Sequence, residues 1–363
     1  FGESHNVLSD SPEHAKRLKT VLPVMSAEKF CILQEFGTQG NEKYDPSYKI
    51  GIYDTTYKGD LKESLYALTE RIIDDVRKNE VRTIILDDRN LNAENKVIPM
   101  LMVVGRLNQE LLKANIRHLT SIVAVTGEVF DPHSAACLLS FGAAAIFPYL
   151  LYHTVEELEE GNEAIKAILK RFRRAMGAGL MKIMSKMGIS TLASYRNSQL
   201  FDVIGLSSEI VEDCFNRATG LLPGLGYEDI DARLNANHQR AFTNALDGKK
   251  NSLYKGGFYK YKKGEEFHDF SRPTISAMQK ASETGKAEDY AEVKKLVNER
   301  DKKFIRDFYD LKSDRAPISI DEVEPLSEIF KRFSTAAMSM GSISQEAHET
   351  LAVAMNTIGG KSN

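Results

Sequence analysis

Short apolar runs alternate with longer amphipathic segments over the first 150 residues of the chain. The apolar runs have the length of strands and occupy residues 49–53, 83–86, 121–125 and 144–149. Helical periodicity lies between them, in residues 98–116 and 133–141 and in the stripe of Leu65, Leu68, Ile72 and Val76. Because strands and helices alternate at this pace, the pattern predicts βαβ crossovers and a parallel sheet. The runs are apolar on both faces, which is typical of a sheet covered by helices on each side.

Charged residues directly follow these predicted strands. Asp87, Asp88 and Arg89 come after the second strand, and Glu128 follows the third. Function in parallel sheets collects at the carboxyl ends of strands, so these residues are candidates for a site. Acids at strand ends also cap the next helix or pair with a neighbouring base. The spacing assigns no acid, base or nucleophile, and both interpretations stay open.

Capping signals indicate where further helices begin. Asp60, with Glu63 three residues later, is typical of a helix start. Thr154 and Glu157 have the same spacing. They predict a helix that carries acids early and the bases of residues 170–174 late, with a solvated charged face.

The middle of the chain is richer in glycine and polar residues. Residues 176–206 contain many Gly, Ser and Met, which indicates a helix with glycine breaks packed on a core, and their glycines lack the spacing of a phosphate-binding loop. Residues 216–325 are polar and are predicted to be irregular. Aromatic residues among lysines at 254–267 predict a hairpin or an irregular arm. Residues 286–311 predict a charged helix, and residues 318–323 an extended connection.

A single strand–helix unit is predicted at the end of the sequence. Residues 333–338 predict the strand. After a turn, Ser342 with Gln345, or Ser344 by itself, caps the helix. The apolar stripe of this helix consists of Ala347, Leu351, Ala354, Met355 and Ile358. A glycine pair at 359–360 ends it. A lone unit cannot bury its own apolar faces, so other elements must complete it.

The composition narrows the classes of protein. Of 363 residues, 42% are hydrophobic and 27% are charged, which excludes disorder, and the length predicts two domains or one barrel with an appendage. The net charge of −3 does not provide the excess of basic residues that nucleic-acid binding requires. No stretch of the sequence approaches the roughly 20 apolar residues of a membrane helix. Cys31, Cys137 and Cys214 lie too far apart for a metal or cluster motif. Their odd number favours a reducing, cytoplasmic location.

Three stretches carry a resemblance to a known family. Residues 180–192 have the sequence LMKIMSKMGISTL, and residues 329–363 have the sequence IFKRFSTAAMSMGSISQEAHETLAVAMNTIGGKSN. Residues 125–150 match more loosely but keep a Thr-Gly-Glu string at 126–128. Together they closely resemble the large subunit of glutamate synthase, over its central domain and the beginning of its flavin-binding synthase domain. Departures such as Arg-Asn-Ser-Gln at 196–199, where the family has Arg-Gly-Ala-Gln, indicate a divergent member.

The resemblance implies an α/β fold with three regions. A central domain with a parallel βαβ sheet is expected at 1–160, and a helical and irregular connecting region at 161–325. The opening portion of a (β/α)8 FMN barrel, incomplete in this chain, is expected at 326–363. The family converts glutamine, 2-oxoglutarate and a reductant into two glutamates. The implied role of this chain is to link the glutaminase and FMN synthase domains.

The resemblance also implies cofactors and partners. The chain has no N-terminal Cys nucleophile and no cluster of three cysteines for iron, so we expect a fragment or separately encoded piece that is not catalytically complete alone. FMN belongs to the complete enzyme. The candidate flavin contacts, at the expected end of the first barrel strand, are Ala336, Ala337, Met338 and Ser339. Alternatively, Met338 fills the barrel interior. Expected partners are the remaining domains and either ferredoxin or a pyridine-nucleotide-linked small subunit, with no nucleic acid and no membrane.

Two other functions stay open. A stand-alone, non-catalytic scaffold or binding protein derived from the family would need oligomerisation to cover the last strand–helix unit. An independent small α/β enzyme would use Asp87, Asp88 and Glu128.

Overall fold

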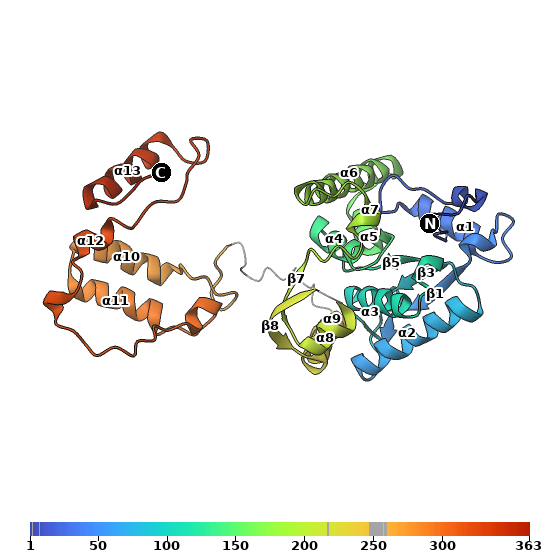
Figure 1. Cartoon of the computed structure of the whole chain (residues 1–363), viewed down its shortest axis with the longest axis horizontal. Helices are drawn as coiled ribbons and strands as arrows, with labels where there is room; N and C mark the ends of the chain where they lie inside the picture. The colour runs from blue at the N-terminus through green and yellow to red at the C-terminus, as the bar shows by residue number, and fades with distance from the viewer. Residues whose placement is uncertain (2, 7, 216–217, 247–256, 258–259) are drawn as a thin grey trace. The chain divides into compact units, whose positions relative to one another are not determined.

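The computed structural model describes residues 1, 3–6, 8–215, 218–246, 257 and 260–363. The chain divides into two compact units, Phe1–Ser252 and Leu253–Asn363, which are described separately (Figure 1). The first unit contains the parallel sheet, and the second consists of helices, short turns and loops.

A four-stranded parallel sheet forms the centre of the first unit. Its strands, in spatial order, are β1 (Ile50–Asp54), β3 (Thr83–Asp87), β5 (Ser121–Val125) and β6 (Ala145–Phe147). The register places Ile52 opposite Ile85 and Ile85 opposite Val123. A bridge between Val24 and Ile146 extends the edge at β6. The parallel sheet predicted from the sequence is therefore confirmed.

Helices cover both faces of this sheet. One face carries α2 (Leu61–Lys78), α3 (Met100–Lys113) and α4 (Pro132–Ser140), and the other carries α1 (Ala27–Gly37) and α5 (Tyr149–Leu158). Ile84 and Leu86 of β3 pack in the first layer, and Ile85 packs in the second. Successive strand residues point to opposite faces, and all three side chains are fully buried. The double covering explains why the strands are apolar on both faces.

A smaller βαβ unit packs against α3. Its elements are β7 (Asp202–Leu206), α8 (Ser208–Cys214) and β8 (Thr219–Leu225), with α9 (Tyr227–Leu246) after them. β7 and β8 pair in parallel. α8 approaches α3 so closely that a Cβ on Gly105 would stand 2.1 Å from the carbonyl oxygen of Cys214. A separate pair of short strands, β2 (Thr56–Tyr57) and β4 (Lys96–Val97), is antiparallel.

One of the two predicted helix caps in this unit is confirmed, and the other is wrong. The Asp60 carboxylate accepts a hydrogen bond from the backbone N–H of Glu63 at 2.8 Å and caps α2. Thr154 instead lies inside α5, where its hydroxyl donates to the carbonyl oxygen of Leu150 at 2.8 Å. The bases at 170–174 belong to the next helix, so the predicted helix with acids early and bases late does not form.

A single long helix, α6 (Asn162–Lys186), runs through the first part of the segment predicted to contain glycine breaks. Gly177 and Gly179 do not interrupt it. A Cβ on Gly177 would stand 2.6 Å from the Leu22 side chain, and one on Gly179 would stand 2.5 Å from Pro132. The glycines therefore allow α6 to approach its neighbours, and the prediction that they break the helix is wrong. The short helix α7 (Leu192–Tyr195) follows.

Helices also occupy much of the stretch predicted to be irregular. α9 lies there, together with α10 (Arg272–Thr284) and α11 (Ala287–Asn298). The helix predicted at 286–311 is confirmed in its first part, but it ends at Asn298. Short 3-10 turns follow at Ile305–Phe308 and Ile320–Glu322. The second of these turns lies where an extended connection was predicted.

The aromatic segment at 254–267 is only partly described. Tyr254, Phe258 and Tyr259 lie outside the described residues. The predicted hairpin or arm therefore stays a prediction. Phe267 is described, and its ring centroid lies 6.1 Å from that of Phe304.

The helix predicted near the end of the sequence is confirmed as α13 (Gln345–Ile358). The Ser344 hydroxyl accepts from the backbone N–H of Ala347 at 3.3 Å, so Ser344 caps the helix by itself. Gly359 ends it in the left-handed conformation, at a φ of 80°. Like every other helix in the described part of the chain, α13 is too short or too polar to span a membrane.

The strand predicted before this helix is wrong. Residues 333–338 follow α12 (Leu326–Phe330) as loop, apart from a single bridge between Ser334 and Lys361. A strand needs a neighbouring ladder for its backbone hydrogen bonds, and the described residues of this unit provide only that bridge.

Candidate functional site

The charged residues predicted at strand ends do meet at the carboxyl edge of the sheet. Asp88 is central there and buried, with 3% of its surface exposed. Its carboxylate accepts hydrogen bonds from the Thr126 hydroxyl at 2.6 Å and from the Gly127 backbone N–H at 3.2 Å. Burial raises the pKa of Asp88 above its ordinary value, and these hydrogen bonds oppose the rise. Asp88 therefore ties the loop after β3 to the loop after β5.

Asp87 and Arg89 pair with each other beside Asp88. The Arg89 guanidinium donates to both carboxylate oxygens of Asp87, over 2.6 to 3.0 Å. Asn90 donates from its side chain to the Asp54 carboxylate at 2.8 Å and so joins this loop to the end of β1. An ion pair with a solvent-exposed arginine contributes about 0.2–1 kcal/mol, so its role here is to order the loop.

Glu128 caps a helix. One of its carboxylate oxygens accepts from the backbone N–H of Met100 at 2.8 Å, at the first turn of α3. Pro99, in the N-cap position, offers no side-chain hydrogen bond of its own. Burial raises the pKa of Glu128 to about 7. The interpretation of the strand-end acids as caps and pairs is thus confirmed for Asp87, which pairs with Arg89. Glu128 caps α3, which precedes it in the chain, rather than the next helix, and Asp88 joins two loops.

A thiol and an imidazole approach each other on α4. Sγ of Cys137 lies 3.7 Å from Nε2 of His133, one helical turn away. Burial raises the pKa of Cys137 to about 11, so the thiol is protonated at neutral pH and is a poor nucleophile. Cys31, Cys137 and Cys214 are all free thiols. Within the described residues, no group of three His, Cys, Asp or Glu side chains is placed to hold a metal ion.

The candidate flavin contacts lie in the loop before α13. Ala336, Ala337 and Ser339 are exposed, and Met338 is partly buried. The carbonyl oxygen of Ser339 accepts from the backbone N–H and the hydroxyl of Ser342, at 3.1 and 2.8 Å. The segment is therefore largely exposed and ends in a turn.

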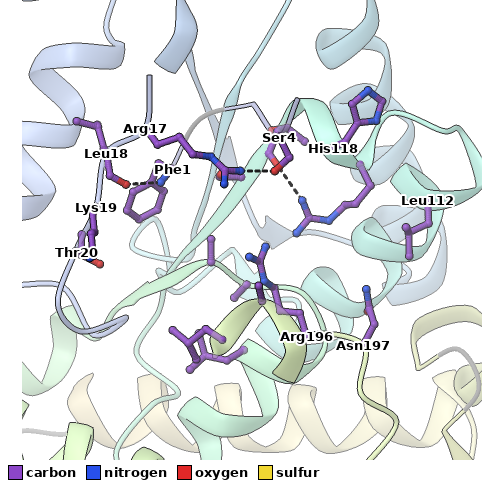
Figure 2. A pocket seen from close by; sticks show the side chains of 18 of the residues that line it. Phe1, Ser4, Arg17, Leu18, Lys19, Thr20, Leu112, His118, Arg196 and Asn197 are labelled. Carbon is purple, nitrogen blue, oxygen red and sulfur yellow. Dashed lines mark hydrogen bonds between the residues drawn. The ribbon is translucent and has the colours of Figure 1, made fainter. Parts of the chain in front are cut away.

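A basic pocket lies at the opposite edge of the sheet, where the sequence predicted nothing. A cleft of about 750 Å³ opens beside Ser121 and Ala144, at the amino ends of β5 and β6 (Figure 2). Its described lining contains no acidic residue, and its basic residues are Arg17, Lys19, Arg117, His118 and Arg196. Because these residues lie far apart along the chain, only the folded structure brings them together.

Comparisons with known proteins cover both units. Residues 1–207 match the model of the glutamate synthase central domain, and residues 268–363 match that of the conserved region in glutamate synthase. Over its full length the chain is 32% identical to the large chain of the NADPH glutamate synthase of Bacillus subtilis, of which it covers 23%. Over its full length it is also 32% identical to the ferredoxin-dependent glutamate synthase of Pyropia yezoensis, with 24% of that protein covered. Over its full length the chain is 33% identical to ferredoxin-dependent glutamate synthase 2 of Arabidopsis thaliana, of which it covers 23%. The chain thus spans about a quarter of the length of these relatives.

Proposed function

Because the chain belongs to the glutamate synthase family, we propose that it forms the part of a glutamate synthase that links the glutaminase domain to the FMN-binding synthase domain. The order of the two family matches carries this proposal, since the central domain at 1–207 is followed in the same chain by the conserved region at 268–363. Coverage of about a quarter of each relative supports a role as one segment of a larger polypeptide.

The reaction of the complete enzyme would convert glutamine, 2-oxoglutarate and a reductant into two glutamates. We assign its catalytic groups to other segments, because Asp88 and Glu128 are engaged in holding loops and a helix end. The double-covered sheet then serves as a rigid connector between the active centres. This architectural role needs stability rather than reactive side chains in the first unit.

FMN supplies the redox chemistry when it is bound in the complete enzyme. We propose that residues 336–339 contact the flavin ring. Their exposure and mostly small side chains fit the close approach of a planar ring, and further segments would have to enclose it. Residues 326–363 would form the opening portion of the barrel.

The electron donor would be ferredoxin or a pyridine-nucleotide-linked small subunit. The chain is 32% identical to an NADPH-named relative and to a ferredoxin-dependent one, so identity favours neither donor. The free thiols of the described cysteines support a reducing compartment, and we propose the cytoplasm.

The size of the native polypeptide tests the proposal. An antibody to this chain should detect, in an extract of the source cells, a band roughly four times the chain's 40.7 kDa, because the chain covers 23% of the Bacillus relative. A band near 40.7 kDa would contradict it and favour a stand-alone scaffold, which would have to cover its exposed apolar side chains by oligomerisation.

Flavin content gives a second, independent readout. The purified 363-residue chain should hold far less than one FMN per molecule, whereas the larger native polypeptide should hold FMN stoichiometrically. Stoichiometric flavin in the chain alone would show that the chain itself holds a complete flavin site. It would overturn the assignment of the remaining flavin contacts to other segments.

A further inference from the structure

The basic pocket is built around Arg117, at the start of the 3-10 turn Arg117–Leu119. Its guanidinium donates to the Asn108 side-chain oxygen at 2.7 Å and to the carbonyl oxygens of Thr120 at 2.7 Å and Gly142 at 2.8 Å. All three acceptors are neutral. Burial, and to a smaller extent the nearby charge of Arg196, lower the pKa of Arg117 to about 10. The pocket therefore has a positive charge in its wall that these hydrogen bonds do not neutralise.

Arg196 projects into the same pocket from the end of α7 (Figure 2). Its guanidinium has no hydrogen-bond or ion-pair partner among the residues that the structure describes. The next residue, Asn197, fixes its backbone. Asn197 has a φ of 57°, and its N–H donates to the Ser140 carbonyl oxygen at 2.8 Å. The amide of the buried Asn108 donates to the Asn197 side-chain oxygen at 2.7 Å, so one residue positions both Arg117 and the loop that carries Arg196.

Arg17 lies across the pocket from Arg196 and donates to the Ser4 hydroxyl (Figure 2). Burial, and then the charge of Arg17, lowers the pKa of Arg196. Like charges held close together in a partly buried pocket repel each other. An anion placed between them removes this repulsion and gains charge-assisted hydrogen bonds.

We propose that this pocket binds a small molecule that carries a phosphate group, with the phosphate held between Arg17 and Arg196. Planar guanidinium forks match the oxygen atoms of phosphate, and a phosphate has about two negative charges to offer two facing arginines. The volume of about 750 Å³ leaves room for more than the phosphate. The apolar part of the lining, which would receive the rest of the ligand, includes Leu112, Leu139, Ala143, Ala144 and Leu192.

Calorimetric titration of the purified protein with pyrophosphate tests the proposal, with succinate as the dicarboxylate arm. We expect saturable pyrophosphate binding that weakens as NaCl is added, and succinate binding at least tenfold weaker. Arg196→Gln should weaken pyrophosphate binding at least tenfold. Arg174→Gln, which removes the same charge from an exposed position on α6, should leave binding unchanged. Absent binding, equal binding of succinate, or an equal loss in both variants would overturn the proposal.

Thermal unfolding in phosphate-free buffer separates a binding role from a structural one. Because Arg196→Gln removes a repulsion, its unfolding temperature should not fall below that of the parent. If the unfolding temperature of Arg196→Gln does fall, the Arg17→Gln variant separates the two roles. Arg17 is exposed, so its replacement removes a charge from the pocket without disturbing the core. Parental affinity for pyrophosphate in Arg17→Gln would then overturn the proposal, and a tenfold loss would support it.

Discussion

At Glu128, a carboxyl group replaces the side-chain cap that Pro99 cannot give to α3. Burial raises the pKa of Glu128 to about 7 from an ordinary value of 4.5. As the pH rises, the unfolded chain therefore releases this proton first, and the folded chain binds more protons between these two values. The stability that Glu128 contributes is complete below pH 4.5 and is lost as the pH rises through 7.

Glu128→Gln isolates this contribution. The amide oxygen can still accept from Met100, so the cap is kept while the titration disappears. Relative to the parent, the variant should gain roughly 2 kcal/mol of stability between about pH 5 and pH 8. Urea unfolding of both proteins at the two pH values measures the gain. A difference in stability that is the same at both pH values would contradict the role of Glu128.

The three thiols should differ in reactivity. Cys31 is exposed, whereas burial raises the pKa of Cys137 to about 11 and that of Cys214 to about 12. Because the thiolate is the reactive form, iodoacetamide at about pH 8 should label Cys31 first and the other two at least tenfold more slowly. Peptide mass spectrometry over time measures the rates. In urea the three rates should converge, and fast labelling of Cys137 in the folded protein would contradict the raised pKa of its partly buried thiol.

Caps could be predicted from the sequence where their atoms lie within one turn. Asp60 and Ser344 bond to N–H groups three residues ahead, and both predictions are confirmed. Thr154 has the same local signal but lies inside α5, because β6 ends at Phe147 and the helix begins at Tyr149. Where a strand ends is decided by its neighbours in the sheet, and a local signal cannot report that.

At the scale of elements, the packing of α8 on α3 depends on Gly105. A Cβ there would stand 2.1 Å from the carbonyl oxygen of Cys214, which is backbone and cannot rotate away. Gly105→Ala should therefore destabilise the first unit by about 1–3 kcal/mol, the usual cost of overpacking. Gly220→Ala in β8 is the matched control, since its Cβ would meet only Val211, at an ordinary 3.6 Å. Urea unfolding compares the two, and equal effects would contradict a close contact between the helices.

The sheet could be predicted because its pattern is local and repeated. Apolar runs of four to six residues separated by amphipathic helices leave little choice of fold, and β5 at Ser121–Val125 has the predicted bounds. The strand at 333–338 could not be judged in this way, because its hydrogen bonds depend on a partner. The role of the glycines in α6 was predicted wrongly for a similar reason. A side chain at these positions is excluded by Leu22 and Pro132, which belong to other segments of the sequence.

At the scale of the whole molecule, the two edges of the sheet contrast. The carboxyl edge was predicted because its acids directly follow the strands. The basic pocket at the amino edge was not, because Arg17, Arg117 and Arg196 come from three separate segments whose meeting depends on the complete fold. Nothing in the periodicity of any one segment indicates such a convergence.

Buried apolar side chains are distributed unequally between the two units of the chain. Every buried large apolar side chain among the described residues lies in the unit Phe1–Ser252. In the other unit, large side chains such as Phe308 and Leu326 are more than half exposed, at 67% each. Since burial of apolar surface is the main stabilising contribution to a fold, the unit Leu253–Asn363 has little to hold its helices in place by itself.

Hydrogen exchange should report this difference directly. Amides of α3 and β5 in the isolated chain should exchange only through global unfolding, because their side chains lie in the core. Amides of α13, whose Leu351 and Val353 are 41% and 64% exposed, should exchange at least a hundredfold faster. In the larger polypeptide that we propose, α13 should gain protection while α3 and β5 keep theirs, because further elements would then cover its apolar face. Equal protection of α13 and α3 in the isolated chain would instead mean that the second unit is stable without those elements, and the incomplete-barrel proposal would fail.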